Sequence, residues 1–135
     1  MEAADAPKKL LLFGQNTVID ERLFHDAQGN LKITKRGREQ YVLYAANAIE
    51  SPDYVYESVE PYRSQLGATL TKRRFLKTFV DEIGRSFYVV IAFTWDVTQA
   101  EFIGSTAFMP VNAKGLPDHA YFEKQQVGKI IHTKK

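Results

Sequence analysis

Positively charged residues cluster at two places in the chain where regular secondary structure is expected. Arg36 and Arg38 lead into an expected helix, and Lys72, Arg73 and Arg74 lie within an expected strand. A guanidinium group can bind two oxygens of a phosphate at once, whereas an ammonium group binds phosphate as a point charge. The two clusters therefore predict a surface that binds a polyanion, although basic residues on an edge strand also serve to prevent edge-to-edge pairing.

Strand geometry limits which of these cations can act together. Because side chains alternate along a strand, Lys72 and Arg74 share one face and Arg73 lies on the other. One of the two faces must cover the helix, so either Arg73 or the Lys72 and Arg74 pair points to the open face. Ser105 and Thr106 alternate in the same way on a neighbouring expected strand, so we expect one of their hydroxyls to reach the open face as well.

A sheet face with guanidinium, ammonium and hydroxyl groups suits the cleavage of RNA without a metal ion. In that reaction the ribose 2′-OH attacks the adjacent phosphorus, and fixed cations stabilise the pentacovalent phosphorane as its charge grows. Proton transfer requires a histidine, a tyrosine or a carboxylate. The three histidines, His25, His119 and His132, lie in or near expected loops without the spacing of metal ligands. We interpret them as proton carriers rather than as metal ligands.

Several other classes of chemistry find no support in the sequence. The chain contains no cysteine, which excludes disulfides, thiol nucleophiles and cysteine-bound zinc. It also lacks a glycine-rich phosphate loop, a zinc-protease motif, an EF-hand and a serine nucleophile elbow. No apolar run approaches the roughly 20 residues of a membrane span. With 135 residues, 44% of them hydrophobic, and a net charge of only +2, we expect one folded domain at residues 10–135 and a flexible linker or artificial extension at residues 1–9.

The central part of the chain gives the strongest structural signals. A helix is expected at residues 37–49, where apolar residues recur at three- and four-residue steps until Pro52 ends the pattern. Strands are expected at residues 54–59, 70–80, 87–95 and 100–109. The run FYVVIAFTW at residues 87–95 is apolar on both strand faces, which predicts a central position in the sheet.

The two ends of the chain give weaker signals. An apolar patch at residues 10–13 is assigned no regular element, and residues 24–34 predict a short hairpin or loop. A short helix is expected from Asp118, and Ile130 and Ile131 form a last strand or an apolar tail. The predicted fold class is therefore α+β: an N-terminal helix packed on a four-stranded antiparallel sheet, followed by a short C-terminal helix.

Four short motifs resemble one known group of proteins in their order and spacing. The motifs are KITKRGR at residues 32–38, PDYVY at 52–56, RRFL at 73–76 and GSTAF at 104–108. They resemble the barnase/EndoU/colicin/RelE-like (BECR) nuclease-fold domains of the phage-associated type, which are found at the C-terminus of Mu F-like head-morphogenesis proteins and in polymorphic toxins. The resemblance covers roughly residues 17–131. The chain departs from the group at two places. It has Tyr56 where the group has a tryptophan, and it has Gln125 and Gln126 before Gly128 where the group tends to have an arginine.

The resemblance implies roles for particular residues. Arg38, Arg74 and Thr106 would contact the phosphate, and His25 would be the leading proton carrier. Further substrate-binding residues would be Lys35, Arg36, Lys72, Arg73, Ser105 and Gln126. No metal or other cofactor is implied.

The resemblance also implies a function and a biological setting. The chain would be a metal-independent endoribonuclease toxin domain that cleaves tRNA or another structured RNA. It would act as a monomer in the cytoplasm of a target cell after secretion or delivery by a virion, and a cognate immunity protein would neutralise it in the producing cell. One alternative is a non-catalytic module of a virion protein that binds nucleic acid or a capsid partner. Another toxin chemistry, nucleotide-dependent transfer to protein or RNA, lacks a nucleotide-binding loop in this sequence.

Overall fold

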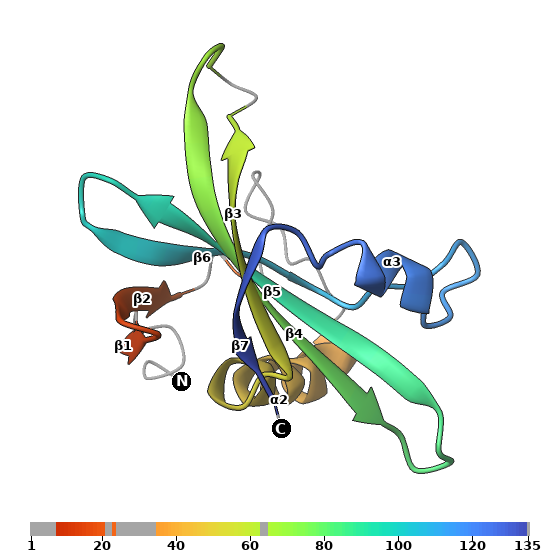
Figure 1. Cartoon of the computed structure of the whole chain (residues 1–135). Coiled ribbons are helices and arrows are strands. Elements are labelled where there is room, and N and C mark those ends of the chain that lie inside the picture. Colours follow the sequence, from red (N-terminus) through yellow and green to blue (C-terminus); the bar gives the residue numbers. More distant parts are fainter. Residues whose placement is uncertain (1–7, 21–22, 24–34, 63–64, 135) are drawn as a thin grey trace.

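The computed structural model describes residues 8–20, 23, 35–62 and 65–134, with the side chains of the long helix described from Tyr41 onward. The described elements are β1 (Lys8–Leu12), β2 (Gln15–Ile19), α2 (Lys35–Glu50), β3 (Tyr54–Pro61), β4 (Thr69–Val80), β5 (Ser86–Asp96), β6 (Glu101–Phe108), α3 (His119–Glu123) and β7 (Lys129–Thr133). Within these residues the strands form a seven-stranded sheet in the order β1-β2-β6-β5-β4-β3-β7 (Figure 1). No described helix combines the length and the apolar character needed to cross a membrane.

The sheet is larger than the sequence predicted. The expectation of an N-terminal helix on a four-stranded antiparallel sheet is wrong, because the described sheet has seven strands and α2 follows two of them. The sheet is also mixed, since β2 runs parallel to β6. The β1–β2 hairpin turns at Phe13 and Gly14, which both have positive φ angles of 49° and 82°. A two-residue turn with positive φ angles matches the twist of a hairpin, but Gly14 alone marks it in the sequence.

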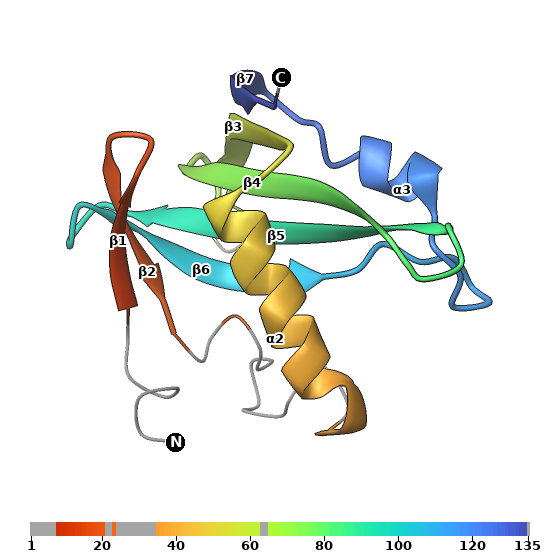
Figure 2. The same ribbon diagram turned by 90° about the horizontal axis from the view of Figure 1, so that it is seen from below.

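Strong apolar patterns produce the centre of the fold. The strands expected at residues 54–59, 70–80, 87–95 and 100–109 are β3, β4, β5 and β6, and α2 is the expected helix. Val89, Ile91 and Phe93 of β5 are fully buried on one face of the sheet and pack with Ala45 and Ile49 of α2. Figure 2 shows α2 crossing the strands on this side.

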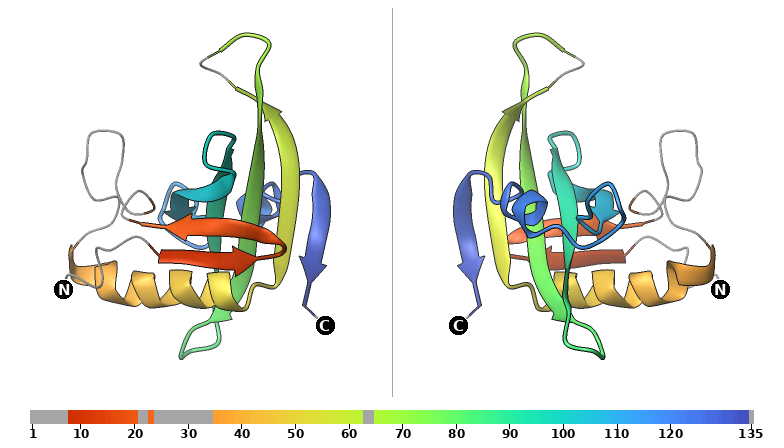
Figure 3. Two further views of the ribbon diagram at one scale, coloured as in Figure 1. Left: turned by 90° about the vertical axis from the view of Figure 1, so that its left-hand side faces the viewer. Right: turned by 90° about the vertical axis from the view of Figure 1, so that its right-hand side faces the viewer.

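The opposite face of the sheet is covered only in part by the described elements. α3 begins at the N-cap Asp118, whose carboxylate accepts a hydrogen bond from the backbone N–H of Tyr121. Phe122 of α3 stacks on Tyr88 with 4.5 Å between the ring centroids, and both rings belong to a small cluster with Val90. Figure 3 shows α2 and the β1–β2 hairpin on one side of the central strands β3–β6, and α3 on the other side. We call the side that carries α3 the open face, because partly exposed polar residues occupy it beyond α3.

Candidate functional site

A row of side chains crosses four strands on the open face. Tyr56 of β3 lies directly opposite Arg74 of β4, Arg74 opposite Ala92 of β5, and Ala92 opposite Thr106 of β6. Directly paired residues point to the same face, so these side chains lie side by side. Because Ala92 is small, the space above it lies between Arg74 and Thr106. We call Tyr56, Arg74, Ala92 and Thr106 the central row.

Both ends of the central row coincide with a β-bulge. The β3–β7 register shifts between Val55 and Tyr56, and the β5–β6 register shifts between Ala92 and Phe93. Bulges bend a sheet and redirect side chains, and they are frequent beside active sites. In β6 the bulge leaves Ser105 as the extra residue. Alternation along β6 is therefore interrupted at this position.

The bulge places a second hydroxyl on the open face. Ser105 Oγ donates a hydrogen bond to the carbonyl oxygen of Ala92 at 3.1 Å, and Thr94 Oγ1 donates to Ser105 Oγ at 3.3 Å. Thr94 is paired with Lys72 and so shares the face of Arg74. Sequence alternation predicted only one hydroxyl from Ser105 and Thr106 on this face, and the bulge explains why both lie there.

An ion pair lies beside the central row. Arg74 Nη1 and Nη2 lie 2.5 Å and 3.2 Å from the two carboxylate oxygens of Glu60, and Nη1 also donates to Ser58 Oγ at 3.3 Å. Ser58 Oγ donates in turn to Glu60. The hydrogen bond from Arg74 is the main reason why the pKa of Glu60 is lowered to about 2, with further contributions from Ser58 and from the charges of Arg74 and Lys72 that outweigh the effect of burial.

A glycine brings the segment after α3 onto the same site. Gly128 has a φ angle of 95°, and a Cβ at this position would overlap with the carbonyl oxygen of Glu57 and lie 2.7 Å from the Cβ of Ser58. Only glycine permits this close approach of two backbones. The preceding residues are thereby held against β3, and Tyr56 donates a hydrogen bond from its hydroxyl to Oε1 of Gln126 at 3.5 Å. Gln126 thus lies at one end of the central row.

A comparison with protein families identifies the group to which these features belong. A family model described as phage-Barnase-EndoU-ColicinE5/D-RelE like nuclease 2 matches residues 8–133. The chain belongs to this nuclease family. No curated protein and no solved structure gave a significant match. The family match extends from β1 to β7, so it includes the short strands at both edges of the sheet as well as the central row.

Arg73 of this BECR-like nuclease lies on the face opposite to Arg74. Its side chain is only 8% exposed, and its Nε donates to Glu57 at 2.8 Å. Nη1 and Nη2 donate to the carbonyl oxygens of Leu12 and Phe13 at 3.0 Å and 3.4 Å, and the guanidinium lies over the ring of Phe102. The side chain ties the tip of the β1–β2 hairpin to the sheet. Of the two arrangements that the sequence left open, the structure has Lys72 and Arg74 on the open face.

Several site residues expected from the sequence lie outside the part of the chain that the structure describes. His25 lies outside the described residues, and the side chains of Lys35, Arg36 and Arg38 in the first turn of α2 are also outside them. Their assignment stays a prediction. In the described residues no group of three or more His, Cys, Asp or Glu side chains is placed so that it could hold a metal ion.

The other two histidines lie elsewhere. His119 of α3 has its ring centroid 5.5 Å from that of Tyr88 and its Nδ1 3.4 Å from the carboxylate of Glu123. His132 of β7 is paired with Val55 and so lies on the α2 side of the sheet. Neither ring belongs to the central row or to its ion pair.

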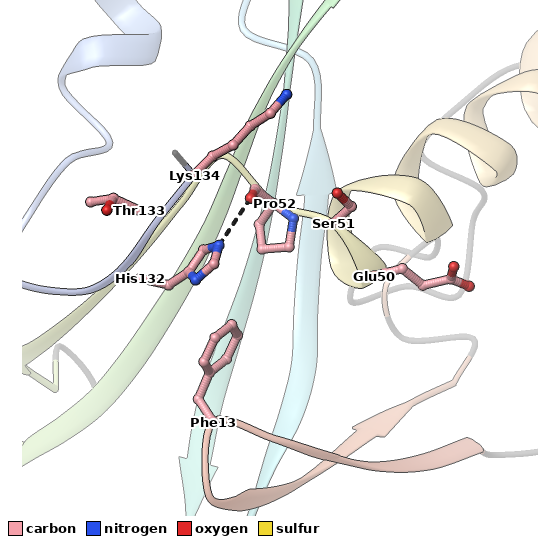
Figure 4. Close-up of a pocket in the computed structure, with 7 residues that line it drawn as sticks. All are labelled: Phe13, Glu50, Ser51, Pro52, His132, Thr133 and Lys134. Atoms are coloured by element: carbon pink, nitrogen blue, oxygen red, sulfur yellow. Dashed lines mark hydrogen bonds between the residues drawn. The ribbon is translucent and has the colours of Figure 1, made fainter.

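An open hollow of about 490 Å³ surrounds His132. Its lining residues are Phe13, Glu50, Ser51, Pro52, His132, Thr133 and Lys134 (Figure 4). His132 Nε2 lies 3.2 Å from the carbonyl oxygen of Pro52, and the ring packs against Phe13. In Figure 4 the carboxylate of Glu50 points away from His132, so the two side chains do not form an acid–base pair. The hollow lies on the opposite side of the sheet from the central row and is not part of the same site.

Three residues of the site were missed by the sequence analysis. Tyr56, Ser58 and Glu60 alternate along β3 and share the open face. The alternation of polar or aromatic residues with Val55 and Val59 was a usable signal. The register between β3 and β4 places these side chains beside Arg74 and Lys72. That register is a property of the pair of strands and could not be deduced from the pattern of either strand.

Proposed function

We propose that this nuclease is a metal-independent endoribonuclease that cleaves tRNA or another structured RNA at the central row. The observation that carries the proposal is the placement of Arg74 and Thr106 on either side of Ala92, with Lys72 and Ser105 beside them. A phosphate above the small Ala92 side chain would meet two hydroxyls and the Lys72 ammonium, and also the Arg74 guanidinium once that group turns from Glu60 of β3 toward β5. These groups suit a phosphorane, whose equatorial oxygens gain negative charge as the reaction proceeds.

The reaction can be written with the residues available. The ribose 2′-oxygen forms a bond to the adjacent phosphorus and loses its proton, and the bond from phosphorus to the 5′-oxygen breaks. The products are a 2′,3′-cyclic phosphate and a 5′-hydroxyl. Glu60 takes the proton of the 2′-OH, and His25 remains the leading residue to protonate the departing 5′-oxygen. Arg38, with Lys35 and Arg36, would bind phosphates elsewhere along the RNA, because α2 lies on the side of the sheet opposite the central row.

The ion pair between Glu60 and Arg74 fits such a role for the carboxylate. A pKa of about 2 makes Glu60 a weak base in the free protein, because Arg74 holds it in the ionised form. A phosphate that binds Arg74 replaces Glu60 as the partner of the guanidinium. The pKa of Glu60 then rises toward its ordinary value, and the carboxylate becomes a better proton acceptor when substrate is bound.

The first experiment is incubation of the protein with total tRNA in excess EDTA. We expect cleavage by the wild-type chain and 2′,3′-cyclic phosphate ends on the products. Arg74→Ala should reduce the rate by a factor of roughly 10² to 10³, the usual effect of removing one group that stabilises the transition state. Arg85→Ala is the matched control, because Arg85 is 70% exposed at the far β4–β5 turn and pairs only with Asp81 among the described contacts.

The outcomes separate the candidate functions. Intact tRNA with wild-type protein, together with salt-dependent binding, would favour a non-catalytic nucleic-acid-binding module. Cleavage that stops in EDTA would overturn the metal-independent mechanism but not the nuclease assignment. Equal loss of activity in Arg74→Ala and Arg85→Ala would remove the central row from the mechanism.

The biological setting is part of the same proposal. The phage association in the family description supports delivery by a virion or by secretion, with action on RNA in the cytoplasm of a target cell. A toxin of this kind requires protection of the producing cell by an immunity protein. This chain would be a monomer, and one immunity protein would bind its open face. Co-expression of the cognate immunity protein should then restore the growth of cells that produce the wild-type chain.

A further inference from the structure

We propose that the open face also contains a nucleobase-binding subsite, formed by Tyr54, Tyr56 and Gln126 next to the central row. The inference rests on the proposed function and extends it to the choice of substrate. The subsite would hold an unpaired base of the RNA next to the phosphate bound at Arg74.

Exposed aromatic and apolar side chains gather at this end of the open face. Tyr54 is 37% exposed and its ring centroid lies 6.4 Å from that of Tyr56. Ile130 of β7, which is paired with Tyr56 of β3, is 39% exposed, and Val127 is 41% exposed. Tyr56 itself is held in place by packing against the cluster under α3. A rigid ring beside an accessible ring is the kind of surface on which unpaired bases stack.

The subsite lies at a suitable position relative to the phosphate. Tyr56 is the direct neighbour of Arg74, and Tyr54 is the diagonal neighbour two residues along β3. Diagonal neighbours in an antiparallel pair lie roughly 7–8 Å apart at their Cα atoms. The Arg74 guanidinium extends from this point toward Ser58 and Glu60, on the side of Tyr56 away from Tyr54. A base at Tyr54 would therefore belong to a neighbouring nucleotide of the same strand. Cationic groups followed by aromatic groups along one path are typical of proteins that bind single-stranded RNA.

Gln126 gives the subsite a means of discrimination between bases. Its Oε1 accepts the hydrogen bond from the Tyr56 hydroxyl, which directs the amide N–H groups of Nε2 away from Tyr56. A base that meets these donors must present an acceptor. Uracil presents O4 at the position where cytosine presents an amino group. At this position of the base edge the Nε2 donors favour uracil over cytosine, and in the same way guanine O6 over the adenine amino group.

Binding to uncleavable RNA tests the subsite independently of catalysis. The probes are fluorescent 2′-O-methyl oligonucleotides of uridine, of cytidine and of abasic ribose phosphate, measured by anisotropy. Because the 2′-OH is blocked, these probes report affinity even if the chain does not cleave RNA. We expect the wild-type affinity to fall in the order uridine, cytidine, abasic.

Two substitutions at Tyr54 isolate the stacking contribution. Tyr54→Ala should weaken the binding of both base-containing probes by roughly tenfold, a typical effect for one stacked base, and leave the abasic probe unchanged. Tyr54→Phe should restore the affinity, because it keeps the ring. Tyr62→Ala is the matched control, since Tyr62 is 43% exposed but lies beyond the end of β3. An equal loss for the abasic probe in Tyr54→Ala, or unchanged binding of all probes, would overturn the subsite.

Gln126→Glu tests the reading of the base edge. The carboxylate accepts hydrogen bonds but does not donate them, so it should favour the cytosine amino group. The added charge lowers the affinity for every probe, and the informative quantity is therefore the ratio of the uridine to the cytidine affinity. We expect this ratio to fall below one. An unchanged ratio would show that Gln126 does not read the base. Failure of the proposed function is recognised separately, by intact tRNA in the cleavage assay with normal binding of these probes.

Discussion

Arg73 and Arg74 are neighbours in β4, yet their guanidinium groups have different partners on opposite faces of the sheet. Arg73 meets a carboxylate of β3, two carbonyl groups of the β1–β2 hairpin and an aromatic ring of β6. Among the described residues, Arg74 meets Ser58 and Glu60, two side chains of the adjacent strand. The first arrangement joins three segments that are distant in sequence. The second presents a guanidinium fork to a carboxylate, whose two oxygens lie as those of a phosphate would.

The comparison shows that residue type does not distinguish a structural arginine from a functional one. At Arg74 both partners are side chains, which can turn away from the guanidinium by rotation about their own bonds. At Arg73 the partners include main-chain oxygens of a folded hairpin, and a ligand could replace them only if the hairpin moved away. The two arginines should therefore fail in different ways when they are substituted.

The largest expected effect is on stability, in Arg73→Ala. The variant removes a guanidinium that is 8% exposed from Glu57, whose side chain is 35% exposed, and leaves the carbonyl oxygens of Leu12 and Phe13 without their donor. A buried acceptor without a partner typically costs about 1–3 kcal/mol, so we expect a total loss of about 2–4 kcal/mol. Chemical denaturation should show a loss of that order in the free energy of unfolding. Arg74→Ala serves as the matched control and should lose less, because its partners are two side chains of one neighbouring strand and no main-chain oxygen loses its donor. Equal losses in the two variants would show that Arg73 and Arg74 stabilise the fold to the same extent.

The next largest effect is on catalysis, in Glu60→Gln. The amide keeps the shape of the side chain but does not accept a proton, so kcat should fall by a factor of roughly 10² to 10⁴. Binding of an uncleavable RNA should stay the same or improve, because Arg74 no longer has a charged partner. Single-turnover cleavage and anisotropy measure the two effects separately. A kcat within a few fold of the wild-type value would mean that Glu60 only positions Arg74.

The same ion pair makes a smaller contribution that depends on pH. The pKa of Glu60 is about 2 in the folded protein, below its ordinary value of 4.5. A lowered folded-state pKa stabilises the fold above the unfolded pKa, and this contribution disappears as the pH falls from about 4.5 to about 2. The difference in unfolding free energy between wild type and Glu60→Gln should therefore be largest near neutral pH. It should decrease below pH 4.5 and vanish near pH 2, and a difference independent of pH would argue against the lowered pKa.

Much of the sheet could be predicted because its central strands are apolar and long. The run at residues 87–95 and the three strands expected around it correspond to β3–β6. The hairpin could not be predicted in the same way, since β1 and β2 have only five residues each and three of the five in β1 are exposed. What stabilises the hairpin is tertiary: Phe13 packs on Phe75, and Arg73 binds the carbonyl groups at the turn. No local pattern contains those contacts.

The site shows the same division between local and tertiary information. Alternation placed Lys72 and Arg74 on one face, and the motif containing Thr106 was visible in the sequence. The ion pair of Arg74 with Glu60 depends on the register between β3 and β4, which cannot be deduced from the sequence of either strand alone. The presence of both Ser105 and Thr106 on the open face depends on a bulge, which inserts one residue and reverses the expected alternation.

The smallest expected effect is a gain of function at Gln126. This residue lies at the end of the central row, where related domains are expected to carry an arginine, and it contacts Tyr56 rather than a charged group. Gln126→Arg adds a cation near the bound phosphate. It should tighten RNA binding a few fold and make the logarithm of the affinity fall about one unit more steeply with the logarithm of salt concentration, as expected for one more phosphate contact. Gln99→Arg, at the exposed turn between β5 and β6, adds the same charge elsewhere and should change neither the affinity nor the slope as much. If the two variants behave alike, the gain reflects net charge, and the end of the central row does not contact the RNA backbone.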